Sequence, residues 1–258
     1  MTGNLAPITH LPTAPRTTMV TPFESANTGE KPIRCLAQDG QQYWCKAFDG
    51  LGVGETVVNE IISIEIGKAI GAPVCDWSIV DIPDELAGTR CDDTIISRLP
   101  MFGSQLVSSV ITDDPIRYVG QDDNYHRFPR LIALWYMCNA EDIQMMYCLD
   151  EDYSVYSIDQ GYWFGSHEMS RELAPITSPA GQTRDVPRLT KPIPLEHWSS
   201  AIQALEQFNP QTLSHINRCI PGEWGVDSDI VDEMVTYAIG RIPYALDKLR
   251  YHQKKSIP

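Results

Sequence analysis

Several features of other protein classes are missing from this sequence of 258 residues. No apolar run approaches the roughly 20 residues that a helix needs to cross a bilayer, and the Pro/Thr-rich segment 1–18 lacks the apolar core of a secretory signal. Basic residues are scarce, since 20 Lys and Arg stand against 34 Asp and Glu, for a formal net charge of −14. So acidic a chain is a poor partner for nucleic acid or for anionic membranes.

The cysteines also lack a recognisable pattern. There are seven, scattered along the chain without a Cys-x-x-Cys pair, which argues against a zinc motif and against a disulfide framework. Several lie inside apolar runs, where free thiols are buried in proteins of reducing compartments. We therefore expect free, buried cysteines and a cytoplasmic protein.

The composition is that of a folded globular chain, with 43% hydrophobic and 21% charged residues. Residues 1–18 are expected to form a flexible N-terminal arm. A β-rich segment with one helix, residues 19–100, precedes a mainly helical segment, residues 101–258. This order predicts an α+β protein with a small N-terminal lobe and a helical C-terminal lobe.

Short strands are expected throughout the N-terminal lobe. The strand-like stretches are Met19–Phe23, Ile33–Gln38, Gln41–Phe48, Val74–Ile82 and Asp93–Leu99. Asp39-Gly40 separates the second stretch from the third and is a hairpin signal. Residues 19–48 should therefore form a small antiparallel sheet.

One helix is expected within the same lobe. Glu55–Ile70 has apolar residues at helical spacings after a loop at 50–54. Gly71 suits a helix C-cap, and Pro73 cannot continue the helix.

The C-terminal lobe should begin with a buried helix at Tyr125–Cys138. Met145–Leu149 and Ser154–Ile158 resemble the two strands of a short hairpin. Residues 196–217 and 227–251 have the apolar spacing of two amphipathic helices.

Four polar residues follow one another in an order typical of a phosphotransfer site. Lys46 ends an expected strand, Glu60 lies on the next helix, and Asp142 and Asp159 lie in later loops. Phosphoryl transfer needs a cation on the nucleotide phosphates, an acid to orient that cation, an acid near the nucleophile and an acid to hold Mg²⁺. The order indicates a kinase-like site.

Each of these residues also has a simpler interpretation. Lys46 is a strand lysine that can reach solvent, Asp159 suits a plain turn, and Asp142 can simply follow the end of a helix. Glu60 differs, because a glutamate among isoleucines is costly to bury unless it is paired. We therefore expect a Lys46–Glu60 ion pair. Either Asp142 or Glu141 could orient a substrate hydroxyl.

Several phrases, in consistent order from about residue 20 to residue 250, resemble HipA-like kinases, especially compact stand-alone ones. In that family a strand lysine is followed by a helix that contains the pair "NE" and ends in a Leu-Gly-Leu-Pro-Val-like phrase. The corresponding segments here are Tyr43–Phe48, Asn59-Glu60 and Ile70–Val74. Ile158–Gly165 is similar to the family's metal-binding segment, and Ile220–Trp224 to its C-terminal phrase.

The resemblance implies a two-lobed protein-kinase-like fold that transfers the γ-phosphoryl group of ATP to a protein or another hydroxyl substrate. It implies that Lys46 binds the phosphates, that Glu60 braces Lys46, that Asp142 is the catalytic acid/base and that Asp159 holds Mg²⁺.

The resemblance also implies two further nucleotide contacts. The segment before the lysine strand would pack over the nucleotide with Ser25, Asn27, Thr28 and Gly29. Ile95–Leu99, including Ser97 and Leu99, would be the hinge strand that offers backbone groups to adenine.

The sequence departs from the family in the catalytic loop, where the family has Asp-Arg-His-x-x-Asn with asparagine as a metal ligand. Tyr147 stands at the asparagine position, or Met146 does if Glu141 is the aligned acid. A phenol with a pKa near 10 is a poor Mg²⁺ ligand, and a thioether is worse. Activity would then depend on whether Gln144 or Asn139 substitutes.

Three hypotheses follow. The chain is a HipA-like kinase, a catalytically impaired pseudokinase that binds a partner as an inhibitor, scaffold or antitoxin-like module, or an acidic interaction protein that binds no nucleotide. Nucleotide binding separates the third from the others, and phosphate transfer separates the first from the second.

Overall fold

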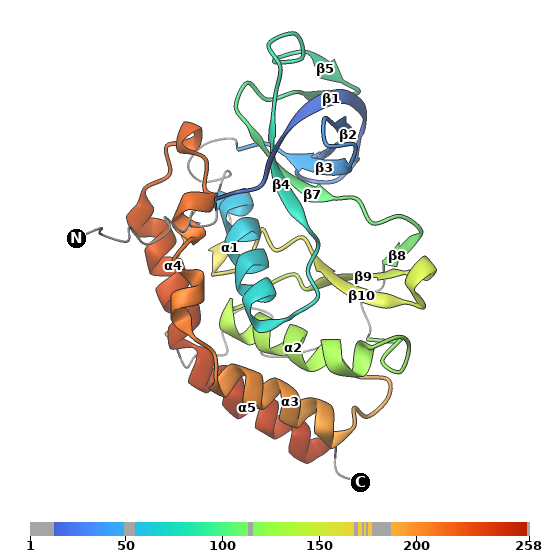
Figure 1. Ribbon diagram of the computed structural model, residues 1–258, viewed down its shortest axis with the longest axis vertical. Coiled ribbons are helices and arrows are strands. Elements are labelled where there is room, and N and C mark those ends of the chain that lie inside the picture. Colours follow the sequence, from blue (N-terminus) through green and yellow to red (C-terminus); the bar gives the residue numbers. More distant parts are fainter. Residues whose placement is uncertain are drawn as a thin grey trace, which may run out of the picture.

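The computed structural model describes residues 13–48, 55–112, 116–167, 170–171, 173, 175–176 and 187–256. A small barrel of strands lies at one end and a group of helices at the other, with α1 (Glu55–Ile70) between them (Figure 1). The chain is an α+β protein with two lobes, as the sequence predicts.

Five strands of the N-terminal lobe close into a barrel in the order β1-β2-β3-β7-β4. They are β1 (Arg16–Ser25), β2 (Ile33–Ala37), β3 (Gln42–Lys46), β4 (Trp77–Asp81) and β7 (Met101–Gln105). Neighbouring strands are antiparallel except β1 and β4, which are parallel. A small apolar cluster that includes Cys35, Tyr43 and Val80 fills the inside of the barrel.

The β2–β3 hairpin places Lys46 on the outside of the barrel. Its turn contains Gly40 with a φ of +82°, which glycine adopts without strain. Side chains alternate along a strand, and Tyr43 and Cys45 are buried in the barrel. Lys46, the next residue, therefore points out of the barrel.

Helix α1 has the bounds that the apolar spacing predicts. Nearly all its side chains are buried, including several polar ones, because the helix packs between the two lobes (Figure 1). The helix ends at Gly71, which has a φ of +70°, and the amide of Ala72 donates to the carbonyl of Gly67 over 2.8 Å. This is the glycine C-cap expected at that position.

Some expected bounds of the N-terminal lobe are wrong. β1 begins at Arg16, so residues 16–18 belong to the barrel, while residues 1–12 and 49–54 lie outside the described part of the chain. β7 lies beyond the boundary expected at residue 100, yet it completes the barrel because it pairs with β3 and β4. The strand expected at Asp93–Leu99 is only β6 (Thr94–Ile95), which forms a separate hairpin with β5 (Arg90–Cys91).

The first part of the C-terminal lobe follows the prediction. Its elements are β8 (Val110–Thr112), α2 (Asn124–Met137), β9 (Gln144–Cys148) and β10 (Ser154–Ile158). β9 and β10 form the expected antiparallel hairpin, and β8 adds a third strand. The amide of Ser157 in β10 donates to the carbonyl of Pro73 over 3.0 Å, which ties the hairpin to the segment that follows α1.

The last helices are shorter than predicted. They are α3 (Leu195–Glu206), the 3₁₀ turns η3 (Pro210–Leu213), η4 (Ile216–Cys219) and η5 (Gly222–Trp224), α4 (Ser228–Gly240) and α5 (Ile242–Lys255). The remaining short elements are η1 (Leu149–Glu151), β11 (Ser166–His167) and β12 (Ser170–Arg171). Pro210 and Pro243 each stand in the first turn of a new element, because proline cannot continue a preceding helix.

Arg241 lies at the break that divides the predicted helix 227–251 into α4 and α5. It is fully buried, and its Nε donates to the carbonyl of Tyr136 over 2.6 Å. That carbonyl lies in the last turn of α2, where helix carbonyls lack intrahelical donors. The break between α4 and α5 thus places a guanidinium at the end of α2.

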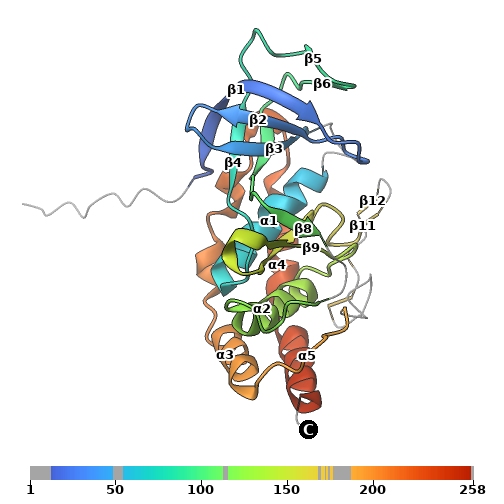
Figure 2. The ribbon, with the colours of Figure 1, turned by 90° about the vertical axis from the view of Figure 1, so that its right-hand side faces the viewer.

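The phrase Ile220–Trp224 joins the two lobes, which lie one above the other in Figure 2. The ring of Trp224 stacks on Phe48 with centroids 5.1 Å apart, and its Nε1 donates to the carbonyl of Pro100 over 2.8 Å. Arg16 of β1 bonds both Asp81 and Glu223. The resemblance at this phrase therefore reflects a structural contact between the lobes.

Two expectations about the whole chain can be compared with the structure. All seven cysteines are free and buried, as predicted. Across the described residues, every helix is too short or too polar to pass through a bilayer.

Candidate functional site

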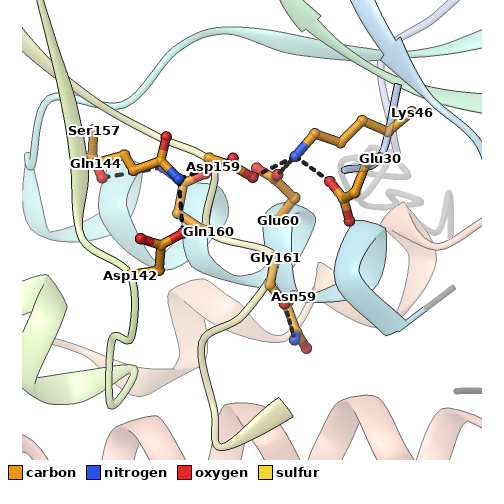
Figure 3. Close-up of polar contacts among 10 residues, drawn as sticks. All are labelled: Glu30, Lys46, Asn59, Glu60, Asp142, Gln144, Ser157, Asp159, Gln160 and Gly161. Carbon is orange, nitrogen blue, oxygen red and sulfur yellow. Dashed lines mark hydrogen bonds and ion pairs between the residues drawn. The ribbon is translucent and has the colours of Figure 1, made fainter. Parts of the chain in front are cut away.

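Lys46 stands among three carboxylates (Figure 3). Its Nζ lies 2.6 Å from Glu60 Oε1, 2.6 Å from Asp159 Oδ1 and 2.7 Å from Glu30 Oε2. Glu60 comes from α1, Asp159 follows β10, and Glu30 comes from the connection between β1 and β2. The predicted Lys46–Glu60 ion pair is present, and two further acids join it.

The three acids carry more negative charge than one ammonium can balance. Burial lowers the pKa of Lys46, but attraction by Glu60, Asp159 and Glu30 outweighs burial and raises that pKa well above its usual value. Burial raises the pKa of Glu60 to about 7, although Lys46 opposes this change. The Glu60 side chain is 3% exposed, so it is the acid that burial affects most. Lys46 therefore stays charged, and Glu60 titrates near neutral pH.

A cavity of about 270 Å³ opens beside Lys46. Its walls are mainly apolar and come from both lobes; they include Trp44, Phe102, Leu106, Val107, Val110, Met146 and Ile158. Lys46, Glu60 and Asp159 form its charged end. Such a mixture of apolar walls and a charged end suits a ligand with an apolar ring and an anionic tail.

A second cavity, of about 380 Å³, lies between residues 187–192 and the end of α5. Its lining contains Arg188, Lys191 and Lys255 but no carboxylate and none of the predicted site residues. The chemistry expected from the sequence is therefore concentrated at the first cavity.

Asn59, the neighbour of Glu60 in α1, holds the segment after Asp159 in place. Its Nδ2 donates to the carbonyl of Gly161 over 2.6 Å and to that of Trp163 over 3.1 Å. A Cβ at Gly161 would lie 3.0 Å from the Cβ of Thr56, so glycine lets this segment approach α1 closely. The Asn-Glu pair thus has two tasks, since Glu60 contacts Lys46 while Asn59 positions the Asp159 loop.

Gln144 links the two aspartates predicted for the site (Figure 3). Its Nε2 lies 2.9 Å from Asp142 Oδ2 and 3.2 Å from Asp159 Oδ2. The φ angles of Asp142 and Asp159 are +48° and +57°. Aspartate adopts this left-handed region more readily than most residues. A non-glycine residue in this region still costs about 1–3 kcal/mol, and such strained residues are concentrated at functional sites.

Tyr147 and Met146, the two residues expected at the family's asparagine position, lie on opposite faces of β9. Tyr147 is fully buried, and its ring packs edge-on against Tyr118 with centroids 4.9 Å apart. Met146 lines the cavity but offers only a thioether. Gln144 is the residue of β9 that reaches Asp159, because alternation places Gln144 and Met146 on one face of the strand and Tyr147 on the other.

The segment expected to cover the nucleotide contributes a residue that the sequence did not indicate. Ser25 ends β1, and its amide donates to Asp92 over 2.8 Å. Ser25, Asn27, Thr28 and Gly29 are not among the residues that line the cavity. Glu30, the next residue, contacts Lys46 instead. A lone glutamate in a turn-rich connector gives no sequence signal for such a role.

The remaining predicted residues lie away from Lys46 or are buried. Ser97 and Leu99 lie in the segment before β7, and the amide of Leu99 donates to Ser97 Oγ over 3.0 Å. Neither residue lines the cavity. The segment that lines it instead is Ser104–Val107, at and after the end of β7. Glu141 is buried, whereas Asp142 is exposed beside Gln144.

Comparisons with known proteins agree with this architecture. The model of the HipA-like kinase family matches residues 20–119. This segment of the chain is similar to HipA-like kinases, as its sequence indicates. The matched segment contains Lys46, Glu60 and Ser104–Val107, and it ends before the loops of Asp142 and Asp159.

Solved structures extend the likeness in fold to most of the chain. The crystal structure of the Helicobacter pylori proinflammatory kinase CtkA matches with a TM-score of 0.56 at 7% identity, over 92% of this chain and 98% of that chain. The Golgi casein kinase with Mn/ADP bound is 13% identical over 91% of this chain and 73% of that chain, with a TM-score of only 0.44. No sequence among the curated proteins matches significantly. The likeness to CtkA shows a protein-kinase fold.

Proposed function

We propose that this HipA-like chain binds ATP in the cavity beside Lys46 and transfers its γ-phosphoryl group to a protein or another hydroxyl substrate. The apolar walls would receive the adenine ring, next to the backbone of Ser104–Val107. Lys46 would bind the phosphates, and Glu60 would hold Lys46 in place.

The single observation that carries the proposal is the contact of one ammonium with acids from both lobes. Lys46 Nζ lies 2.6 Å from Glu60 of the N-terminal lobe and 2.6 Å from Asp159 of the C-terminal lobe. A structural ion pair would need only one partner. Acids from both lobes hold Lys46 at the charged end of an apolar cavity. A lysine held in this way can position the phosphates of a nucleotide.

The residues next to Lys46 also suit Mg²⁺, which prefers hard oxygen ligands. Asp159 offers a carboxylate, and Gln144 offers an amide whose oxygen and nitrogen exchange places by a simple rotation. Gln144 now donates to Asp159, and the rotated amide would present its oxygen to a cation there. Bound Mg²⁺ would neutralise charge on the phosphates. Asp142, exposed and next to Gln144, would accept the proton of the incoming hydroxyl.

The test is a thermal-shift titration of the full chain with ATP, with and without Mg²⁺, on the wild type and on Asp159→Asn. Saturating ligand at about 100 Kd adds roughly 2.7 kcal/mol, or about 5–10 °C for a chain of this size. We expect a Mg²⁺-dependent shift that Asp159→Asn removes and that the control Asp150→Asn, in the exposed turn η1, retains. No shift at millimolar ATP in the wild type would contradict the proposal.

A second candidate function is favoured by Glu30. Glu30 occupies part of the hydrogen-bonding capacity of Lys46, as a phosphate would. A pseudokinase that binds nucleotide weakly and acts by binding a partner would have this feature. The two candidates differ in one result, since only the kinase transfers labelled phosphate from [γ-³²P]ATP to itself or to a protein substrate.

Glu30→Gln is expected to tighten ATP binding about tenfold, as measured by titration calorimetry. The substitution removes a negative charge that competes with the phosphates for Lys46, and tenfold corresponds to about 1.4 kcal/mol. Glu24→Gln is the matched control, because Glu24 of β1 pairs with Arg34 of β2 and its side chain is 52% exposed. Weaker ATP binding in Glu30→Gln would show instead that Glu30 helps to hold the nucleotide.

A further inference from the structure

A second cluster of potential ligands lies further along α1. Glu65 of α1 meets His215 and Cys219, which lie before and at the end of η4 in the C-terminal lobe. One ligand atom from each residue lies within 4.8 Å of the others. The three residues are far apart in the sequence, so their spacing gives no metal motif.

The hydrogen bonds of His215 leave one ring nitrogen to be explained. Nδ1 lies 2.8 Å from the carbonyl oxygen of Thr212, which can only accept, so Nδ1 carries the proton. Nε2 lies 2.7 Å from Glu65 Oε2, which as a carboxylate oxygen also accepts. A neutral imidazole would then turn a lone pair towards a carboxylate. At this distance the contact needs a shared proton, and a metal ion could replace that proton if the two groups moved slightly apart.

The other groups have the arrangement found around zinc ligands. A metal-binding histidine typically donates its second ring nitrogen to a carbonyl, as His215 does to Thr212. The second oxygen of Glu65 accepts from Trp77 Nε1 over 2.8 Å, which fixes the carboxylate. Cys219 is only 2% exposed, and its sulfur makes no hydrogen bond within the described part of the chain. An unbonded thiol thus faces an oxygen and a nitrogen donor in a nearly closed site.

We propose that Glu65, His215 and Cys219 bind one Zn²⁺ ion, with water or no ligand at the fourth position. Nitrogen, sulfur and carboxylate oxygen are the donors that Zn²⁺ takes in proteins, at about 2.0–2.3 Å. Tetrahedral geometry with such bonds places the ligand atoms about 3.3–3.8 Å apart. The three ligand atoms lie within 4.8 Å of one another, but His215 Nε2 and Glu65 Oε2 are 2.7 Å apart, so these two atoms would separate by about 1 Å to hold the ion. Mg²⁺ and Ca²⁺ are poor alternatives because they select oxygen ligands.

The ion would tie α1 to the C-terminal lobe. Glu65 lies about one and a half helical turns after Glu60, so the metal would fix the helix that holds Glu60 against Lys46. This role does not depend on phosphate transfer, because the ligands lie outside the cavity beside Lys46.

The test is a Co²⁺ titration of the full chain after removal of metal with a chelator, followed by displacement with Zn²⁺. We expect about one Co²⁺ per chain and a near-ultraviolet charge-transfer band from the Cys219 thiolate, both lost when Zn²⁺ is added. Cys219→Ser should abolish the band, and His215→Gln should weaken binding at least tenfold. Cys91→Ser, in the β5–β6 hairpin, is the control and should retain the band.

Two results would overturn the proposal. One is a wild type that binds no more Co²⁺ or Zn²⁺ than the His215→Gln/Cys219→Ser double variant, which would leave a protonated histidine paired with Glu65. The other is a thiolate band that persists in Cys219→Ser. If a variant fails to fold, the wild type alone decides the question, because one equivalent of Zn²⁺ must raise its Tm above that in chelator.

Discussion

Lys46→Met is expected to lower the free energy of unfolding by about 3–5 kcal/mol and to abolish the ATP-dependent thermal shift. The Lys46 side chain is 13% exposed and that of Glu60 3%. Removing one partner of a buried ion pair leaves an uncompensated charge, which costs this amount. Methionine fills most of the space of the lysine side chain. The loss in free energy of unfolding therefore measures removal of the ammonium group rather than formation of a cavity. Urea unfolding measures the stability, and ATP titration measures the binding.

The loss should depend on pH in a defined direction. Lys46 lowers the pKa of Glu60, which burial raises to about 7 from an ordinary value of 4.5. Without Lys46 that pKa rises further. An acid whose pKa is higher in the folded state than in the unfolded state stabilises the fold while it is protonated. This contribution to stability falls as the pH rises from the pKa of the unfolded state through the pKa of the folded state. Lys46→Met should therefore lose less stability at about pH 5.5 than at about pH 8.

Lys68→Met provides the matched control. Lys68 lies in the last turn of the same helix that carries Glu60, but its side chain is 38% exposed and its partner Asp76 is 75% exposed. Exposed pairs contribute about 0–1 kcal/mol. An equal loss of stability in both variants, or a Lys46→Met loss that does not change with pH, would contradict the role assigned to Glu60.

The parts of the fold that the sequence predicted are those governed by local rules. The β2–β3 hairpin follows from alternation and one Asp-Gly turn, and α1 follows from apolar spacing and Gly71. The Lys46–Glu60 pair could be predicted because a buried glutamate needs a partner. Each of these inferences uses residues less than about 20 positions apart or a single energetic penalty.

The features that the sequence missed depend on contacts between distant segments. Barrel closure requires β7 to pair with both β3 and β4, and no local signal distinguishes β7 from the stretch Asp93–Leu99. Glu30 contacts Lys46 from the connection between β1 and β2, 16 positions earlier in the chain. The Glu65–His215 contact joins residues 150 positions apart.

The catalytic loop is a special case, because counting residues places Tyr147 or Met146 at the asparagine position but does not show which side chain of the loop reaches Asp159. The loop between α2 and β9 is short, and β9 begins at Gln144. Residues counted from Asp142 to Tyr147 therefore enter the strand, where alternation turns Tyr147 into the core. The side chain that reaches Asp159 is that of Gln144, two residues after Asp142 and one of the two substitutes that the sequence suggested.

If the chain is a kinase, Gln144→Leu is expected to lower kcat about 10²–10³-fold, as removal of one electrostatic group at a transition state does. Leucine has nearly the same volume but no amide oxygen for Mg²⁺ and no donor for Asp142 and Asp159. Gln144→Asn restores the residue type that HipA-like kinases have as a metal ligand, and it should keep activity within about tenfold of the wild type. Phosphate transfer from [γ-³²P]ATP, measured at several Mg²⁺ concentrations, compares the three proteins.

The Mg²⁺ dependence separates a metal-binding role from a merely structural one. A lost ligand raises the Mg²⁺ concentration needed for half-maximal activity, whereas general damage to the fold lowers activity equally at all concentrations. If the wild type transfers no phosphate, the same comparison applies to the ATP-induced thermal shift, whose Mg²⁺ dependence Gln144→Leu should remove and Gln144→Asn should keep. Unchanged Mg²⁺ dependence in Gln144→Leu would mean that Asp159 alone holds the ion, and that the amide between the two aspartates only keeps their carboxylates apart.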